Sequence, residues 1–485
     1  MQSVNSKALF WSVLNNISKL VSTFVAPIIL ARILGPESFG IIAMAFVLVG
    51  LSQIFIDFGS TDAIVKSKNI TKKFLSSLFW FNLLICILVF LFLILLTPFV
   101  ANFFQRDQLQ IIIPLLSLSM FFQVVSIVPT SIFRRQKDFK SITLCDVNST
   151  IFSTIFAIST ALYDFGVYSL VVLSVSQSII YCILINFYSK NYLRAYFSFR
   201  YIRLVFSFTA TMFYIKVINH FERQSDRFFI GPSYGDAILG IFSRGQAFQK
   251  SLQRFINGSF NPVLFSVITR ENSNTFLKSS LEKSYQGFFL IMFPLFLYFF
   301  FFSRDLVLFL FGNEWIFMSE LLPYFSILFL IRPFQKINQE IIKAKGNVHF
   351  LGLCFTFLTP LLVACYYFMP SDLGIFGYIY AYVFVSVLLF VFSSIYLTNL
   401  AKMNLYFFPK IFLTFLPRII FLVTTTLILR NYILTNDFYF LNLSVFGLFL
   451  IFAMIIMQKL HFMEVHENFK TIMIQNLKSL KIKLS

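Results

Sequence analysis

The sequence predicts an all-α protein that crosses a membrane many times, with about fourteen transmembrane helices. Of its 485 residues, 58% are hydrophobic and only 12% are charged, a balance typical of polytopic membrane proteins. Apolar runs of about 20 residues recur along the whole chain, and each is long enough to cross a hydrocarbon core of about 30 Å. The connections between these runs are short, which excludes a separate soluble domain.

The apolar runs set the positions of the expected spans. The first run lacks a small-residue cleavage site, so it is expected to be retained and not removed as a signal peptide. A count of twelve spans stays open, because the loss of one helix pair would leave the termini on the same side. We expect transmembrane helices at residues 10–34, 39–63, 76–101, 109–133, 142–163, 166–189, 205–230, 236–263, 285–303, 318–334, 349–369, 373–398, 411–430 and 438–458.

The basic residues are distributed unevenly between the two sides of the membrane. With the N-terminus in the cytoplasm, the predicted internal segments carry 26 Lys and Arg residues and the external ones carry four. This positive-inside bias predicts that both termini are cytoplasmic. It also explains the net charge of +19 without a nucleic-acid partner. Residues 459–485 are expected to form a basic cytoplasmic tail on the anionic inner leaflet.

The seventh and eighth predicted spans contain many charges for segments at membrane depth. Each such group costs at least ~2.5–3.5 kcal/mol in lipid, so these side chains are expected to face protein or water. Each span carries a polar stripe at i, i+4, i+7 and i+11, and Arg244 lies about a quarter-turn from the second stripe. Neighbouring stripes predict a basic, water-accessible cavity for an anionic cargo. Their residues are Lys216, His220, Arg223 and Arg227 in one span and Lys250, Arg254, Asn257 and Asn261 in the other.

Two other interpretations of these charges stay open. Residues 206–227 could lie on the membrane surface as an amphipathic helix. Internal ion pairs could also hold the helices together without forming a cavity, with Glu222 and Asp226 bonded to Arg223 and Arg227 and Asp57 bonded to Lys250.

Other polar residues within the spans are further candidates. Lys19 in the first span either joins the cavity or extends to the cytoplasmic interface. Asp57, Glu222 and Asp226 are candidates for coupling to H⁺ or Na⁺, although a plain ion pair explains Asp57 as well. The five cysteines lack metal-ligand spacing, and we expect neither a metal site nor another cofactor. Without a catalytic triad, a paired-carboxylate motif or a P-loop, the sequence predicts no catalytic residues.

A faint internal repeat divides the chain. The sequence from Ile33 to Gly40 is echoed by the sequence from Phe229 to Gly240, at an offset of 196 to 200 residues. We therefore expect a six-helix half at residues 1–200, a second at 201–400, two additional helices at 401–458 and the tail at 459–485. Parallel halves of this kind form a substrate path at their interface.

Four segments resemble one transporter family. The run from Ala31 to Ala45 is similar to the leading signature of the polysaccharide exporters, the Wzx-like flippases of the multidrug/oligosaccharidyl-lipid/polysaccharide superfamily. The other three segments are Asp57-Phe58-Gly59, the basic loop from Phe133 to Lys140, and the run from Asp226 to Arg244. The resemblance covers about the first 285 residues and continues mainly as a helix pattern.

The resemblance implies transport of an undecaprenyl-diphosphate-linked oligosaccharide across the bacterial inner membrane, for O-antigen, capsule or exopolysaccharide synthesis. A polysaccharide polymerase and other assembly proteins are the implied partners. A cationic cavity fits that cargo, because a diphosphate accepts hydrogen bonds from Arg and Lys. Two alternatives stay open. A multidrug or cation antiporter of the same superfamily would favour acidic cavity residues, and an integral membrane polymerase or ligase usually needs a long external loop, which this chain lacks.

Overall fold

The computed structural model describes residues 6–57, 60–67, 70–136, 138–189, 196–268, 274–400, 404 and 406–432. These residues are almost entirely helical, as the apolar runs predict. Contacts divide the chain into two compact units, Met1–Arg244 and Gly245–Ser485, and each is described by itself.

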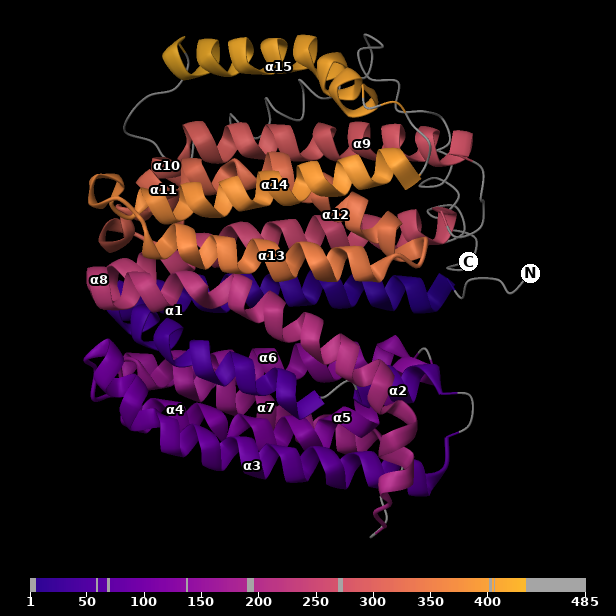
Figure 1. The fold of residues 1–485 in the computed structure, drawn as a ribbon. Coiled ribbons are helices and arrows are strands. Elements are labelled where there is room, and N and C mark those ends of the chain that lie inside the picture. The colour runs from indigo at the N-terminus through magenta and orange to yellow at the C-terminus, as the bar shows by residue number, and fades with distance from the viewer. Residues whose placement is uncertain are drawn as a thin grey trace, which may run out of the picture. The chain divides into compact units, whose positions relative to one another are not determined.

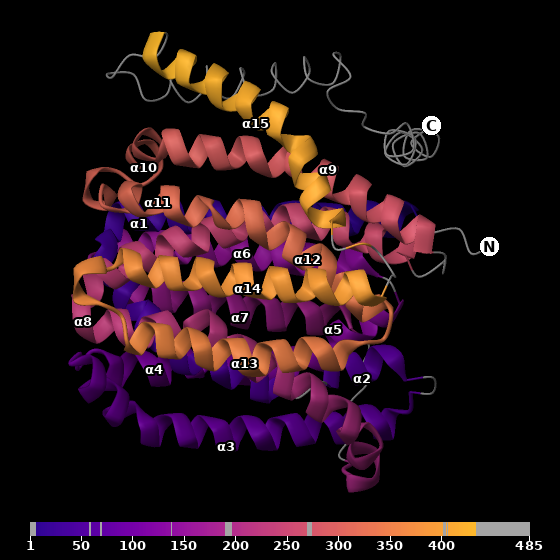
Figure 2. The same cartoon turned by 45° about the horizontal axis from the view of Figure 1, so that its top comes forward.

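The N-terminal unit is a helix bundle in which α6 and α7 pack along each other and against their neighbours. Helix α6 also packs on α1, and α5 packs on α7. Figures 1 and 2 show α3 to α7 side by side in this unit. Its helices are α1 (Ser6–Asp57), α2 (Ser60–Lys66), α3 (Lys72–Phe104), α4 (Leu109–Ser117), α5 (Ser119–Gln136), α6 (Phe139–Leu162), α7 (Tyr168–Tyr188) and the first part of α8 (Phe199–Ile268).

Two glycines bend the two longest helices. Gly35 in α1 has φ 68° and ψ 175°, and Gly235 in α8 has φ 79° and ψ 177°. A positive φ is strained for residues with a side chain, so glycine is the residue suited to both bends. The bends fall within the predicted turns at residues 35–38 and 231–235. The sequence echo aligned Gly35 with Gly231, but Gly231 is helical and packs closely on the Phe104 ring, where a Cβ would come within 2.7 Å.

The two bent helices cross through a reciprocal glycine contact. A Cβ on Gly40 would overlap the carbonyl oxygen of Asp236, and a Cβ on Gly240 would overlap that of Pro36. Each contact becomes the other when 200 is added to or subtracted from the residue numbers. Only glycine permits backbones to approach this closely, so these two positions fix how α1 and α8 meet.

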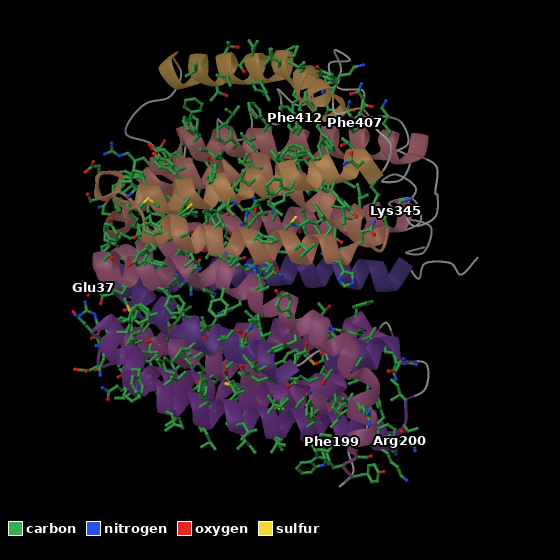
Figure 3. All side chains as sticks on the ribbon, in the orientation of Figure 1. Glu37, Phe199, Arg200, Lys345, Phe407 and Phe412 are labelled. Carbon is green, nitrogen blue, oxygen red and sulfur yellow. The ribbon has the colours of Figure 1, made fainter. Side chains whose placement is uncertain are left out.

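The C-terminal unit begins within α8 and contains shorter, broken helices. Figure 3 labels Lys345 at the end of α12 and Phe407 at the start of α15, toward the same end of this unit. Its further elements are α9 (Asn274–Phe301), α10 (Ser303–Leu310), η1 (Asn313–Trp315), α11 (Met318–Ser326), α12 (Leu328–Ala344), α13 (Val348–Tyr367), η2 (Ser371–Leu373), α14 (Phe376–Leu400) and α15 (Phe407–Tyr432).

Most predicted spans correspond to observed helices, with two kinds of difference. The expected spans at 109–133 and 318–334 are each interrupted, at Leu118 and Ile327. The span expected at 39–63 ends at Asp57 and is followed by the separate short helix α2. The expected span at 438–458 and the tail at 459–485 lie outside the described residues.

By length and composition, nine helices of the described residues can cross a membrane, so this is a multi-pass membrane protein. Helix α3 illustrates the lipid-facing surface: Leu95 and Phe99 leave 70% and 71% of their surface exposed. Exposed apolar side chains on this scale fit contact with lipid.

Candidate functional site

The predicted stripe of α8 lies along the second part of α1. The Lys216 ammonium donates to Asp57 Oδ2 at 2.9 Å. One turn further on, His220 Nε2 lies 3.0 Å from the carbonyl oxygen of Val47. As the residue numbers rise along α8, those of the partners fall along α1, so the two segments run in opposite directions. The stripe is therefore fixed to a second helix and does not lie on the membrane surface.

Farther along the stripe, the Arg227 guanidinium donates to the carbonyl oxygen of Ala43 at 3.0 Å. Gly50 makes room for the imidazole of His220, because a Cβ there would approach the ring to 2.9 Å. Small residues and backbone carbonyls of α1 therefore hold the polar side chains of α8 in place. This pairing combines the cavity and helix-binding interpretations, since the side chains contact α1 and also face a pocket.

The pocket has a volume of about 420 Å³ and lies wholly in the N-terminal unit. Arg223 is exposed in it and makes no hydrogen bond or ion pair with any residue that the structure describes. The expected Glu222–Arg223 pair is thus not formed. The lining of the pocket comprises Phe46, Gly50, Gln53, Ile54, Lys216, Asn219, His220, Arg223, Gln224 and Arg227. Four of these side chains are basic and none is acidic, so the pocket suits an anion.

Several buried polar atoms around this pocket have unfilled hydrogen-bonding capacity. Within the described part of the chain, Arg227 Nε, Arg244 Nε and Gln224 Oε1 are buried without a hydrogen-bond partner. The Arg244 guanidinium stacks on the ring of Phe39, 5.1 Å from its centroid. Unpartnered buried donors are costly, so two arginine donors favour a bound anion or water.

The acidic candidates have different surroundings. Asp57 accepts hydrogen bonds from Lys216 and from the hydroxyl of Thr61, the latter at 2.7 Å. Asp226 is buried and accepts the backbone N–H of Arg227. Glu222 is half-buried. The predicted partner of Asp57 was Lys250, whereas the structure pairs Asp57 with Lys216.

The second stripe belongs to the C-terminal unit. The Lys250 ammonium lies 5.5 Å from the centroid of the Tyr382 ring, and the Arg332 guanidinium lies 4.3 Å from the same centroid. Arg254 donates to Ser251 Oγ at 2.9 Å. Arg332 and Tyr382 were not predicted as site residues. Arg332 stands alone in its apolar run, so only the contact with Tyr382 reveals it.

Three predicted positions receive no side-chain description. Lys19 lies in α1 and Asn257 and Asn261 lie in α8, but their side chains are outside the described set. Among the residues that are described, no group of three or more His, Cys, Asp or Glu side chains could hold a metal ion.

An ion pair at the edge of the predicted spans joins the end of α3 to the bend in α8. Arg106, after α3, binds both carboxylate oxygens of Asp236, at 2.8 and 2.9 Å. Arg106 lowers the pKa of the Asp236 carboxyl, and this effect outweighs that of burial. Asp236 directly follows the bend at Gly235, so the pair ties that bend to α3.

Comparison with known proteins decides the family. A family model described as polysaccharide biosynthesis protein matches residues 29–320, which include the α1 bend and both stripes. The chain belongs to this family. The resemblance to the Wzx-like polysaccharide exporters is confirmed. The chain is 24% identical to the teichuronic acid biosynthesis protein TuaB of Bacillus subtilis (strain 168), over 61% of this chain and 62% of TuaB.

Two further similarities concern transport proteins. The chain is also 24% identical to the succinoglycan biosynthesis transport protein ExoT of Rhizobium meliloti (strain 1021), over 64% of each. The matched parts thus span less than two thirds of TuaB and ExoT. The fold of this chain is similar to that of the lipid II flippase MurJ in an inward closed conformation. The TM-score is 0.70, with 17% identity over 92% of this chain and 99% of MurJ.

Proposed function

We propose that this exporter moves an undecaprenyl-diphosphate-linked oligosaccharide from the inner to the outer face of the bacterial inner membrane, and that the pocket along α8 holds the diphosphate. The observation that carries the proposal is Arg223, which faces a pocket with four basic and no acidic side chains and has no partner among the described residues. A guanidinium binds phosphate oxygens through two parallel N–H donors.

The cargo and the lining are complementary in charge. Arg223 brings positive charge without a protein partner among the described residues, whereas Lys216 is paired with Asp57 and Arg227 donates to the Ala43 carbonyl. The unpartnered Nε of Arg227 gives the diphosphate a further donor. Phosphates contribute several acceptors at once, so they can satisfy these donors together.

Transport then proceeds by alternating access. Two six-helix halves rock against each other, with fourteen spans and both termini in the cytoplasm. Several features recur between the halves: the bends at Gly35 and Gly235, and the breaks at Leu118 and Ile327, which each follow a proline by four residues. Lys250 and Arg254 would contact the same cargo, and so would Lys19. A polymerase would take over the exported glycan.

Coupling to H⁺ or Na⁺ would supply the energy for transport. Asp57 is the acidic residue most directly joined to the pocket, through Lys216. Protonation of Asp57 would release the Lys216 ammonium to the cargo, which offers a route to H⁺ coupling. Glu222 and Asp226 are alternatives for H⁺ or Na⁺.

A multidrug antiporter is less well supported, because a cationic drug would be repelled by the lining of this pocket. An enzymatic role is also less well supported, because ExoT is named as a transport protein and the similar fold is that of a flippase.

A complementation experiment tests the proposal. A strain that lacks the protein should accumulate the lipid-linked oligosaccharide, and the wild-type chain should restore the surface polysaccharide. Arg223→Ala should reduce that restoration at least tenfold at equal membrane abundance, whereas Arg223→Lys should retain part of it. Arg200→Ala, which changes an exposed arginine at the start of α8, is the matched control (Figure 3). Full export by Arg223→Ala would remove this residue from the mechanism.

A further inference from the structure

A second polar pocket lies next to the cationic one in the N-terminal unit. It has a volume of about 440 Å³ and is lined by residues of α1, α2, α5, α6 and α7. Gln53 lines both pockets. Asp57 lines the second pocket and pairs with Lys216, which lines the first. The two pockets therefore meet at one side chain and one ion pair.

The chemistry of the second lining differs from that of the first. Uncharged amides and hydroxyls predominate, including those of Gln123, Thr130, Gln177 and Tyr181. The charged members are Asp57, Asp146 and Arg134. Such a mixture of donors and acceptors suits a ligand with many hydroxyl groups, whereas an acidic ligand would meet two carboxylates and one guanidinium.

Part of this hydrogen-bonding capacity is available to a ligand. The Thr130 and Tyr181 hydroxyls lie 3.0 Å apart and bond to each other, so each retains further capacity. Gln177 donates to Thr150 Oγ1 at 3.1 Å, which leaves its carbonyl oxygen to accept. The half-buried amide of Gln123 has no hydrogen-bond partner among the described residues. An amide in this position is stabilised when a ligand or water bonds to it.

We infer that this pocket is a glycan subsite, which binds a neutral, hydroxyl-rich sugar of the cargo while the adjoining cationic pocket binds its diphosphate. The inference rests on the proposed function. Thr61 and Arg134 line the pocket next to connections that the positive-inside pattern assigns to the cytoplasm, so the sugar can enter from the side where the cargo is made.

The subsite explains how one transporter can distinguish cargoes that share the same lipid diphosphate. Cationic side chains recognise every diphosphate alike, so they give affinity without selectivity. Directional hydrogen bonds from Gln123, Gln177 and Tyr181 depend on where the sugar carries its hydroxyl groups. Selectivity between glycans therefore falls to the second pocket.

Binding measurements with two probes separate the two pockets. The probes are undecaprenyl diphosphate, which has no sugar, and the lipid-linked oligosaccharide extracted from a strain lacking the transporter. Wild-type protein in nanodiscs should bind the second probe more tightly. Gln123→Ala and Tyr181→Phe should each weaken that binding by about two- to tenfold, the effect of one lost hydrogen bond, and leave undecaprenyl diphosphate unaffected.

Two further variants complete the design. Arg223→Ala should weaken binding of both probes, because both carry the diphosphate. Gln110→Ala, at an exposed glutamine of α4 that lines neither pocket, should change neither affinity. Thermal unfolding of each variant identifies any that has lost its fold, and Tyr181→Phe provides a second test if Gln123→Ala is unstable.

The outcomes distinguish the two proposals. If Gln123→Ala and Tyr181→Phe bind both probes as wild type does, or lose affinity for both equally, the glycan subsite is rejected. An Arg223→Ala effect on both probes would still support the diphosphate pocket in that case. If wild-type protein binds neither probe, the proposed function itself fails.

Discussion

The Lys216 ammonium lies 2.9 Å from the Asp57 carboxylate, although the two residues are 159 positions apart in the sequence. This pair joins α8 to the C-terminal end of α1 and lies between the cationic pocket and the polar one. Both side chains are partly exposed, at 38% and 26%, which limits the stability that their attraction provides.

A double-mutant cycle of Asp57→Asn and Lys216→Met tests the strength of this pair. We expect a coupling free energy of about 1 kcal/mol in thermal or detergent unfolding, above that of a surface pair because it is half-buried. The i, i+4 pair of Lys336 and Glu340, whose side chains are 37% and 18% exposed, serves as the reference for a pair within one helix, with an expected coupling of about 0.4 kcal/mol. Equal coupling in both cycles would mean that the Lys216–Asp57 pair between helices is no stronger than a pair within one helix.

The glycine crossing of α1 and α8 gives a prediction about packing. Gly40→Ala and Gly240→Ala should each destabilise the protein by about 1–3 kcal/mol, because the added methyl group overlaps a backbone carbonyl that cannot rotate away. Thermal unfolding of the purified variants measures this loss.

Gly287→Ala and Gly352→Ala are the matched controls for that crossing. Both glycines are helical, and an added Cβ would meet nothing within 4 Å. We expect these variants to be neutral or slightly more stable, since alanine favours helices. If all four variants behave alike, the close approach of the two helices is not real.

The Arg106–Asp236 pair makes stability depend on acid. Arg106 holds the pKa of Asp236 below its ordinary value of 3.8, so the unfolded chain binds a proton more readily than the folded one. The contribution of this ion pair to the free energy of unfolding is complete above about pH 3.8. It is lost as the pH falls through the pKa that Asp236 has in the folded protein. Because Arg106 is 43% exposed, we expect it to be small, about 0.5 kcal/mol.

Unfolding of wild type and Asp236→Asn between pH 8 and pH 3 measures this contribution. The difference between them should be constant at neutral pH and should shrink only at the acid end of the series. Arg106→Gln should reproduce the behaviour of Asp236→Asn. A difference that grows as the pH falls would have the wrong sign for this ion pair.

A buried hydrogen-bond network in the C-terminal unit is expected to stabilise the fold and to take no part in transport. The Tyr285 hydroxyl donates to Asn338 at 2.7 Å, and Asn338 donates to Ser393 and Ser394 at 3.2 and 3.0 Å. Asn338→Leu should cost about 2–3 kcal/mol, because it leaves buried hydroxyls without a partner. Tyr285→Phe should cost about 1 kcal/mol.

Export per folded molecule separates this network from the pocket residues. Both network variants should lower membrane abundance while each remaining molecule exports normally. Reduced export per molecule in Tyr285→Phe would instead place the network in the transport cycle.

The sequence predicted the helices better than it predicted the contacts. Apolar runs locate α3, α6, α7, α13 and α14 to within a few residues, because a membrane requires length and apolarity. The break at Leu118 could not be predicted, since the surrounding run is continuously apolar. The Gly35 bend was predictable from Gly-Pro, whereas the second bend lies at Gly235 and not at the Gly-Pro pair of Gly231, which helix packing holds in the helical conformation.

The site was predicted in part. Helical spacing placed Lys216, Arg223 and Arg227 on one stripe, and the structure brings them to one pocket. The partners of that stripe were not predictable, because the carbonyls of Ala43 and Val47 carry no sequence signal. The polar pocket was missed because its lining comes from five helices, and its largest contribution from one helix, the stripe of Gln123, Ser126 and Thr130 in α5, is uncharged.

Reactivity of a cysteine at position 223 tests the central claim most directly. In a background without the five native cysteines, Arg223→Cys and Asn219→Cys should both react with a polar maleimide, and undecaprenyl diphosphate should slow the reaction of Asn219→Cys, which retains Arg223. Leu30→Cys, at a fully buried position, should not react. Absence of reaction at 223 and 219 from either side of the membrane, or a reaction at 219 that the diphosphate lipid does not slow, would contradict a hydrated anion pocket along α8.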